Sequence, residues 1–364
     1  MKKTVCAILT TILAVVSNFY SNATDDVRLI RFPDINNKLI AFVYAGDIWT
    51  VNSSGGDARR LTSHEGLELF PKISPDGKWI AFSGEYSGSR QIFVMPSEGG
   101  VPRQLTWYNS VGIMPPRGGW DNVPLDWTPD SKQILFFSPR EGKFGGIFRK
   151  QADGTGEDEK FVAAPDLSLY PWSLSSDGKT LVVMDTPDPY TRGDLSMLSM
   201  EGDHARKPLL NNPDFLETQA RLSPDGKWLA YVSSESKRNE VYVRPFPDVT
   251  KGRWQVSTNG ATAPLWSPNG RELFYLGEEE GAAMSVPVET GQAFSAGTPK
   301  KLFPFTPYMG GGSTPGTAWD IHPDGKRFLM MKLPGAAPSA PAGARKFIIV
   351  LNWFEELKQR APVK

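Results

Sequence analysis

Short polar turns, each followed by a run of large apolar residues, recur along almost the whole chain. The clearest copies read Ser-Pro-Asp-Gly-Lys, at residues 74–78 and 223–227. Proline presets the first corner, aspartate bonds back to the following backbone, and glycine accepts the left-handed conformation that closes the turn. The pattern therefore predicts a repeated β-hairpin. Variants of the turn stand at 128–132, 175–179, 267–271 and 322–326, and an eroded copy stands first at 35–38.

The apolar runs after the turns are continuous, which is typical of strands covered on both faces. They predict strands at 39–42, 79–82, 133–136, 180–183, 228–231, 272–275 and 327–330. A third strand follows each copy with cleaner alternation, so we expect it to be less buried. These strands are predicted at 47–49, 91–94, 146–148, 195–198, 240–243, 283–286 and 347–350.

A short, polar fourth strand closes six of the copies, and basic residues in it protect a sheet edge from foreign strands. These outer strands are predicted at 59–62, 103–106, 160–162, 207–210, 254–257 and 301–303. The last copy lacks a clear fourth strand and continues into a short amphipathic helix near 353–360. The residues just after the N-terminal leader are one candidate for the missing edge.

Equivalent turn positions are 40 to 55 residues apart, which matches one four-stranded propeller blade with loops of variable length. The sequence therefore predicts an all-β fold, a β-propeller of four-stranded antiparallel blades. Seven blades are expected, and six are the alternative if the first or last repeat does not form a blade. No linker divides residues 24–364, so they are expected to form a single domain.

The first 23 residues have the pattern of a secretory signal peptide. A basic start is followed by an apolar stretch at 5–16 and by small residues at 21 and 23. A membrane anchor is the alternative, but the apolar run is shorter than the roughly 20 residues that a spanning helix needs. We expect cleavage after Ala23, a periplasmic or secreted protein, and no stable membrane insertion afterwards. The only cysteine, Cys6, lies in this leader, so the exported chain would have no disulfide.

The charges give no sign of a nucleic-acid partner. Forty basic and forty acidic residues cancel, and the sequence shows no basic stretch of the kind that tracks a phosphate backbone.

Nearly the whole exported chain resembles the TolB-type, WD40-like β-propellers of exported bacterial proteins, because of these repeated turns and apolar runs. Residues 29–150 more narrowly resemble the N-terminal propeller of tricorn protease homologues, through the motifs at 31–33, 41–49, 59–66 and 119–122. Residues after about 220, including 351–357, are similar to propellers appended to some bacterial kinases and sensors. The resemblance implies a catalytic serine in domains that follow the propellers, so no catalytic residue of that family can be placed on this sequence.

Candidate chemistry is sparse. Of the three histidines, His322 occupies the serine position of a turn, His204 is expected to be solvated in a hairpin, and His64 lies between two blades, where it either faces a ligand or makes a loop hydrogen bond. No Gly-x-Ser-x-Gly elbow occurs. The acidic segment 153–159 resembles a calcium loop only loosely. No cofactor and no metal site are expected.

The loops between blades are the remaining candidates, since long loops on a rigid fold often carry function. They hold a mixture of aromatic and charged side chains of the kind that anchors a partner peptide. The candidate binding residues are His64, Glu65, Trp107, Tyr108, Arg117, Trp120, Asp121, Tyr170, Asp214, Phe215 and Tyr308. An alternative is that these side chains only seal the loops against the blades.

The leading hypothesis is a non-enzymatic exported propeller that binds an envelope protein or peptide at its channel mouth. The alternative is an accessory or relic propeller that presents peptides to a tricorn-like serine peptidase on another chain. A propeller hydrolase with channel-lining carboxylates has little support, because no cluster of acids and histidines can be placed at equivalent blade positions. The oligomeric state is left open.

Overall fold

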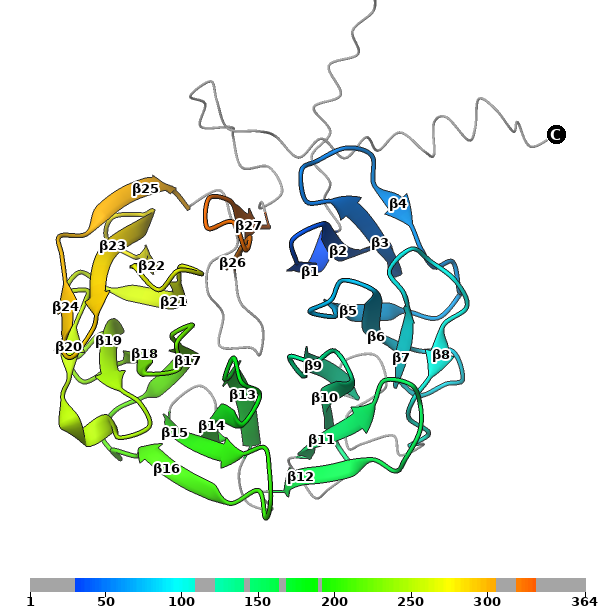
Figure 1. Ribbon diagram of the computed structural model, residues 1–364, viewed down its shortest axis with the longest axis horizontal. Coiled ribbons are helices and arrows are strands. Elements are labelled where there is room, and N and C mark those ends of the chain that lie inside the picture. The colour runs from blue at the N-terminus through cyan, green and yellow to red at the C-terminus, as the bar shows by residue number, and fades with distance from the viewer. Residues whose placement is uncertain are drawn as a thin grey trace, which may run out of the picture. The chain divides into compact units, whose positions relative to one another are not determined.

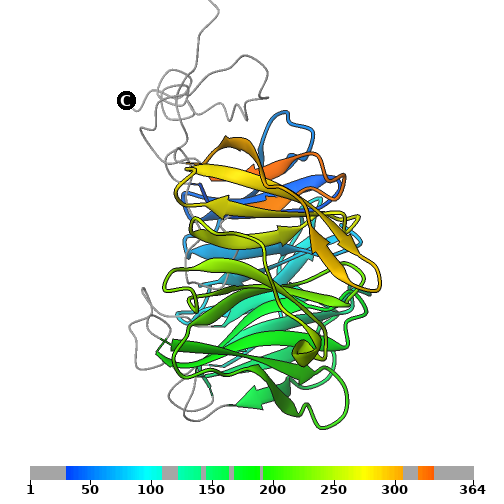
Figure 2. The same ribbon diagram turned by 90° about the vertical axis from the view of Figure 1, so that its left-hand side faces the viewer.

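Seven antiparallel sheets follow one another along the chain in the computed structural model. The structure describes residues 30–108, 122–140, 145–163, 168–188, 192–305 and 319–331. Residues 27–349 form one compact unit. Within it the sheets surround a common axis, with the first strand of each sheet innermost (Figure 1), and neighbouring sheets pack face to face when seen from the side (Figure 2). In the described part of the chain, no helix is long and apolar enough to cross a membrane.

The first three blades have the same strand order. Blade 1 holds β1 (Ile30–Ile35), β2 (Leu39–Tyr44), β3 (Asp47–Asn52) and β4 (Arg59–Arg60). Blade 2 holds β5 (Glu68–Ile73), β6 (Trp79–Gly84), β7 (Gln91–Pro96) and β8 (Arg103–Gln104). Blade 3 holds β9 (Val123–Trp127), β10 (Gln133–Ser138), β11 (Gly146–Gln151) and β12 (Glu159–Ala163).

The remaining blades differ mainly at their outer edges. Blade 4 holds β13 (Ser168–Leu174), β14 (Thr180–Asp188), β15 (Arg192–Ser199) and β16 (Arg206–Leu210). Blade 5 holds β17 (Glu217–Leu222), β18 (Trp228–Ser233), β19 (Glu240–Pro245), the 3₁₀ turn η1 (Val249–Lys251) and β20 (Trp254–Gln255). Blade 6 holds β21 (Ala261–Trp266), β22 (Glu272–Gly277), β23 (Ala282–Thr290), β24 (Phe294–Ala296) and β25 (Lys300–Pro304). Blade 7 is described through β26 (Trp319–Ile321) and β27 (Phe328–Met330).

The predicted all-β, seven-bladed propeller is confirmed, and every predicted second strand is present. The expectation of lower burial in the third strands is wrong for β7, whose first five residues are all buried. The candidate outer strand after the leader is also wrong for residues 30–35, because β1 is the innermost strand of blade 1. The leader, the last predicted third strand at 347–350 and the helix near 353–360 lie outside the described residues.

The repeated turn closes as its sequence predicts. The Ser74 hydroxyl donates to Asp76 Oδ1 (2.6 Å), and that oxygen also accepts from the Lys78 amide (3.0 Å). The hydroxyl hydrogen bond lowers the pKa of Asp76. Gly77 has φ +74°, and Ser131, which takes the same position in blade 3, has φ +61°. In the eroded first copy, Asn36 Oδ1 accepts from the amides of residues 38 and 39, both at 2.8 Å.

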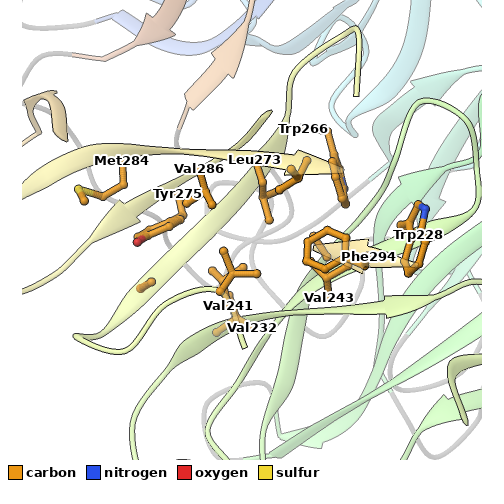
Figure 3. Packing of buried hydrophobic residues seen from close by; sticks show 14 of the residues in the cluster. Trp228, Val232, Val241, Val243, Trp266, Leu273, Tyr275, Met284, Val286 and Phe294 are labelled. Atoms are coloured by element: carbon orange, nitrogen blue, oxygen red, sulfur yellow. The ribbon is translucent and has the colours of Figure 1, made fainter. Parts of the chain in front are cut away.

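Apolar side chains fill the interfaces between neighbouring blades. Figure 3 shows the largest cluster, where side chains of β18 and β19 meet those of β21, β22 and β23. β24, which the hydrophobic pattern did not predict, places Phe294 against Trp228 and Trp254 of blade 5, with ring centroids 5.5 and 5.6 Å apart. The Trp228 indole also donates to the Thr290 carbonyl (3.2 Å), so the β23–β24 hairpin ties blade 6 to blade 5.

Blade 7 closes the ring against blade 1. Leu329 of β27 packs in one cluster with Ile40, Phe42 and Val51. His322 Nε2 donates to the Asn37 carbonyl (3.0 Å), and its Nδ1 accepts from the Asp324 amide (3.1 Å). Arg327 Nη1 donates to the Ser53 carbonyl. The turn role expected for His322 is confirmed, with a link between blades in addition.

Candidate axial binding site

One position of the inner strand recurs in the same register in every blade. It is the penultimate residue of the strand, and in blades 1 to 6 it pairs with the third residue of the second strand. In blade 7 the equivalent pair is Asp320 and Leu329. We call these seven positions the axial ring. They are Asp34, Lys72, Asp126, Ser173, Arg221, Leu265 and Asp320.

The charged members of the axial ring interact across the axis. Lys72 of blade 2 is under the electrostatic influence of Asp34, Asp126 and Asp320, which belong to blades 1, 3 and 7. Arg221 of blade 5 interacts with Asp126 and Asp320. These residues come from five different blades whose inner strands surround one axis (Figure 1), so the interactions place their charges near one another.

Asp34 and Lys72 form the ion pair of the ring, with Nζ and Oδ1 3.0 Å apart. The other oxygen of Asp34 accepts from the Ile73 amide (2.8 Å), so this carboxylate joins blade 1 to blade 2. Burial by itself lowers the pKa of Lys72, but the charges of Asp34, Asp126 and Asp320 outweigh it and raise that pKa. Lys72 therefore stays protonated at neutral pH.

Asp126 and Asp320 are held by their own backbone. Asp126 Oδ1 accepts from the Trp127 amide and Asp320 Oδ1 from the Ile321 amide, both at 2.8 Å. Within the described residues, neither carboxylate forms an ion pair. Desolvation by the surrounding protein raises the pKa of Asp126. Desolvation, together with the charge of Asp34, raises the pKa of Asp320 to about 6. Asp126 is exposed to solvent, and Asp320 is half-buried.

Arg221 and Ser173 connect blades 4 and 5 at the same level. Arg221 Nη1 donates to the Trp172 carbonyl, and the Ser173 hydroxyl oxygen accepts from the Leu222 amide (3.1 Å). Burial lowers the pKa of Arg221, and Asp320 and Asp126 oppose that shift. Arginine remains charged in proteins, so the ring carries two fixed cations.

An aromatic pair, of which Phe32 is exposed and Phe70 half-buried, lies close to the ring along β1 and β5. Phe32 and Phe70 precede Asp34 and Lys72 by two residues, and their ring centroids are 4.2 Å apart. Both have positive φ, 51° and 56°, at bulges where two inner-strand residues face one residue of the neighbouring strand. Bulges of this kind re-aim side chains. Phe32 keeps 36% of its surface exposed.

The candidate residues His64 and Glu65 are exposed on the connection from blade 1 to blade 2. His64 Nδ1 accepts from the Gly66 amide (2.9 Å), and its ring packs on Tyr86 at 4.2 Å. The loop hydrogen bond, one of the two alternatives for His64, is thus present. His204 lies in the hairpin between β15 and β16, but the expectation that it is solvated is wrong. It is half-buried, its ring packs on Phe161 (4.1 Å), and its Nε2 contacts Glu159 Oε1 (3.1 Å).

Trp107 and Tyr108 lie at the end of blade 2. Trp107 is 65% exposed. The backbone of Tyr108 is fixed by the Gln91 side chain, which donates to its carbonyl (2.5 Å) and accepts from its amide (3.2 Å). The Arg140 guanidinium stands 5.1 Å from the Tyr108 ring centroid. Trp107 therefore remains available to a partner, whereas Tyr108 is partly used within the fold.

The other described candidates also divide into residues used within the fold and residues available to a partner. Tyr170 lies in the inner strand β13 and packs against the core between blades 4 and 5. Asp214 is exposed, and Phe215 is half-buried beside it on a turn held by Asn212. Arg117, Trp120, Asp121 and Tyr308 lie outside the described residues. The inter-blade connections that hold these candidates lead into the inner strands at the end opposite to the axial ring.

Aspartates occupy equivalent positions in three of the blades. The prediction that no acids can be placed at equivalent blade positions is therefore wrong for the carboxylates. The signal was present in the sequence, because Lys72, Asp126, Arg221 and Asp320 each stand two residues before the first residue of a turn, and Asp34 stands two residues before Asn36 of the eroded copy. No histidine accompanies them in the ring. Among the residues described here, no group of three or more His, Cys, Asp and Glu is placed to hold a metal ion.

Residues 27–192 match the family described as the tricorn protease N-terminal beta propeller domain. The matched segment is somewhat less than half of the chain, and it is similar to the propellers of that family. The chain is 34% identical over 83 residues to the "Putative Tricorn-like protease N-terminal subunit" of Sulfurisphaera tokodaii, covering 22% of this chain and 42% of the relative. It is 22% identical over 245 residues to "Tol-Pal system protein TolB" of Wolinella succinogenes, covering 61% and 53%.

Among solved structures, an oligogalacturonate lyase from Vibrio parahaemolyticus is similar with a TM-score of 0.54 at 13% identity, over 82% of this chain and 78% of the other. At this identity the likeness concerns the fold alone. The chain spans between 8% and 53% of the lengths of the first five curated relatives that it matches.

Proposed function

We propose that this protein is an exported, non-enzymatic propeller that binds a segment of an envelope protein or a peptide at the axis. The observation that carries the proposal is the axial ring, in which five charged residues from five blades converge and two carboxylates have no ion-pair partner in the described chain. A half-buried charge such as that of Asp320 is costly unless it is paired, so a purely structural set would be expected to pair it. Asp126 and Asp320 instead present free oxygen atoms at the axis.

The proposal is tested by comparing two charge reversals at exposed aspartates. Tagged wild-type protein, Asp126→Arg and Asp214→Arg would be used to capture partners from the native envelope, followed by mass spectrometry. We expect Asp126→Arg to lose the partner that the wild type captures, and Asp214→Arg on the inter-blade loop to keep it. Circular dichroism checks that both variants fold.

Two results would overturn the axial location. The first is loss of the partner only with Asp214→Arg, which would move the site to the inter-blade loops with Trp107 and Phe215. The second is retention of the partner by both variants. Turnover of an ester or peptide panel by the purified chain would contradict the non-enzymatic assignment.

A second candidate function is support of a peptidase on another chain. The observation that favours it is the similarity to a relative named as a putative N-terminal subunit of a tricorn-like protease. In that case the captured partner would be a serine peptidase. Its peptidase activity would rise when the wild-type propeller is added and would not rise with Asp126→Arg.

A further inference from the structure

The charges of the axial ring do not cancel. Three carboxylates against one lysine and one arginine leave a formal charge of −1. Lys72 is already engaged, because its Nζ lies 3.0 Å from Asp34 Oδ1. Arg221 directs one guanidinium nitrogen to the Trp172 carbonyl. The unbalanced negative charge therefore resides with Asp126 and Asp320.

Asp126 and Asp320 can each accept more hydrogen bonds than they do. Each uses one oxygen for a backbone amide (2.8 Å in both cases), and a carboxylate has capacity for several further hydrogen bonds. Desolvation by the surrounding protein raises the pKa of both groups, and the charges of Lys72 and Arg221 offset that shift only in part. A positively charged group at the axis would supply both the charge and the missing donors.

The structure also restricts the kind of cation. The described residues form no metal-binding group, so the geometry does not favour a metal ion. Phe32 is exposed and contacts Phe70, and both lie two residues along their strands from Asp34 and Lys72, a separation of roughly 7 Å. An organic cation that carries an apolar side chain next to it would contact the carboxylates and the aromatic pair together.

We propose that the axial ring binds the ammonium group of a peptide, with Asp126 and Asp320 as its anionic partners and an adjacent apolar side chain against Phe32. This inference rests on the proposed function and names the chemistry that the axial site selects. The ammonium group belongs to a lysine side chain or to a free amino terminus, and the experiment separates these two sources.

The test is titration calorimetry with three short peptides. The first is the blocked peptide acetyl-Ala-Phe-Lys-Ala-amide, the second has norleucine in place of lysine, and the third is Phe-Ala-amide with a free amino terminus. We expect an ammonium-bearing peptide to bind about ten-fold or more tightly than the norleucine peptide, because one unscreened charge contact is worth at least that much. Whichever of the first and third peptides binds identifies the source of the cation.

Variants of the ring should change this affinity according to charge. Asp126→Asn and Asp320→Asn should each weaken binding of the ammonium peptide several-fold, and Asp57→Asn, a matched loss of one exposed carboxylate outside the candidate sites, should leave the affinity unchanged. Ser173→Asp places a new carboxylate at the equivalent position of blade 4 and should increase the affinity for the ammonium peptide. Affinity should also fall as the pH is lowered through about 6, where Asp320 takes up a proton.

Equal affinity for the lysine and norleucine peptides, with no binding of the free amino terminus, would overturn the inference. So would unchanged affinity in both asparagine variants, or stabilisation of the protein by Ca²⁺ alone with no response to ammonium peptides. If the peptides fail while Asp126→Arg still loses the captured envelope partner, the proposed function stands and the ammonium assignment falls. If Asp126→Arg has no effect either, both fall.

Discussion

At the scale of single residues, the same position has different chemistry in different blades. Glu68 and Glu217 both begin an inner strand. Glu68 accepts from Thr62 Oγ1 (2.6 Å) and from the Tyr86 hydroxyl (2.9 Å). Glu217 is 5% exposed, and its Oε2 has no hydrogen-bond partner in the described chain. Burial, together with the charges of Asp194 and Glu235, raises its pKa from 4.5 to about 7.

Glu217 should make the protein less stable as the pH rises. Between about pH 4.5 and 7 the folded chain holds a proton that the unfolded chain releases, so stability is highest below this window and is lost through it. Glu217→Gln should therefore raise the free energy of unfolding at pH 8 by about 1–2 kcal/mol, after allowance for solvent screening. Urea unfolding at pH 5, 7 and 8 measures the effect.

The exposed Glu65→Gln is the control and should change stability by less than about 0.5 kcal/mol at every pH. A Glu217→Gln protein that is less stable than the wild type at pH 8 would show that the carboxylate is needed in its ionised form.

At the scale of elements, the strands that follow a turn were predictable and those that precede it were not. Continuous apolar runs located β2, β6, β10, β14, β18 and β22 within a few residues, because these strands are covered on both faces. The inner strands carry bulges with left-handed residues such as Phe70 and Gln219, which break the two-residue period. Side-chain direction at the axial ring depends on those bulges, so sequence periodicity did not reveal it.

The second hairpin of blade 6 was missed for a different reason. β23 runs to Thr290 and pairs with β25 through its first part and with β24 through its last part. The repeat has one outer strand per blade, and nothing in the turn motif signals an added strand. Phe294 is the residue that fixes it, through contacts with two tryptophans of the neighbouring blade.

His322 should prove to be a closing residue as well as a turn residue. His322→Ser restores the side chain found in other copies of the turn and keeps the turn itself, but it removes the hydrogen bond to the Asn37 carbonyl. We expect a loss of about 1 kcal/mol, typical of one hydrogen bond, seen as a lower midpoint in thermal unfolding. In blade 5, which does not close the ring, Ser223→Ala tests the turn alone. An unchanged midpoint for His322→Ser would mean that packing of Leu329 closes the ring without this bond.

At the scale of the whole molecule, each blade is held by two neighbours. Open repeat arrays gain stability from nearest-neighbour interfaces and fray at their ends. Contacts between blades 7 and 1 remove those ends within the described unit. Local damage at one interface should therefore lower the stability of the entire ring.

Trp319→Ala tests this cooperativity. Trp319 is 2% exposed, stacks on Phe328 at 5.1 Å and donates to the Ala263 carbonyl (2.9 Å) between blades 6 and 7. Its loss should cost about 3–5 kcal/mol. We expect one transition at lower temperature, with far-ultraviolet circular dichroism and tryptophan fluorescence coinciding. Separate transitions for the two signals would show that blade 7 opens independently.

The equal register of the seven axial positions has a consequence for how such proteins diversify. Under the proposed function, one substitution at a charged position of the ring would alter what the centre recognises while leaving the hairpins intact. Two relatives with nearly identical blades can thus prefer different ligands, and two with little overall identity can share a preference. Grouping homologues by the amino acids at the seven axial positions should therefore sort them by ligand specificity better than similarity over the whole chain does.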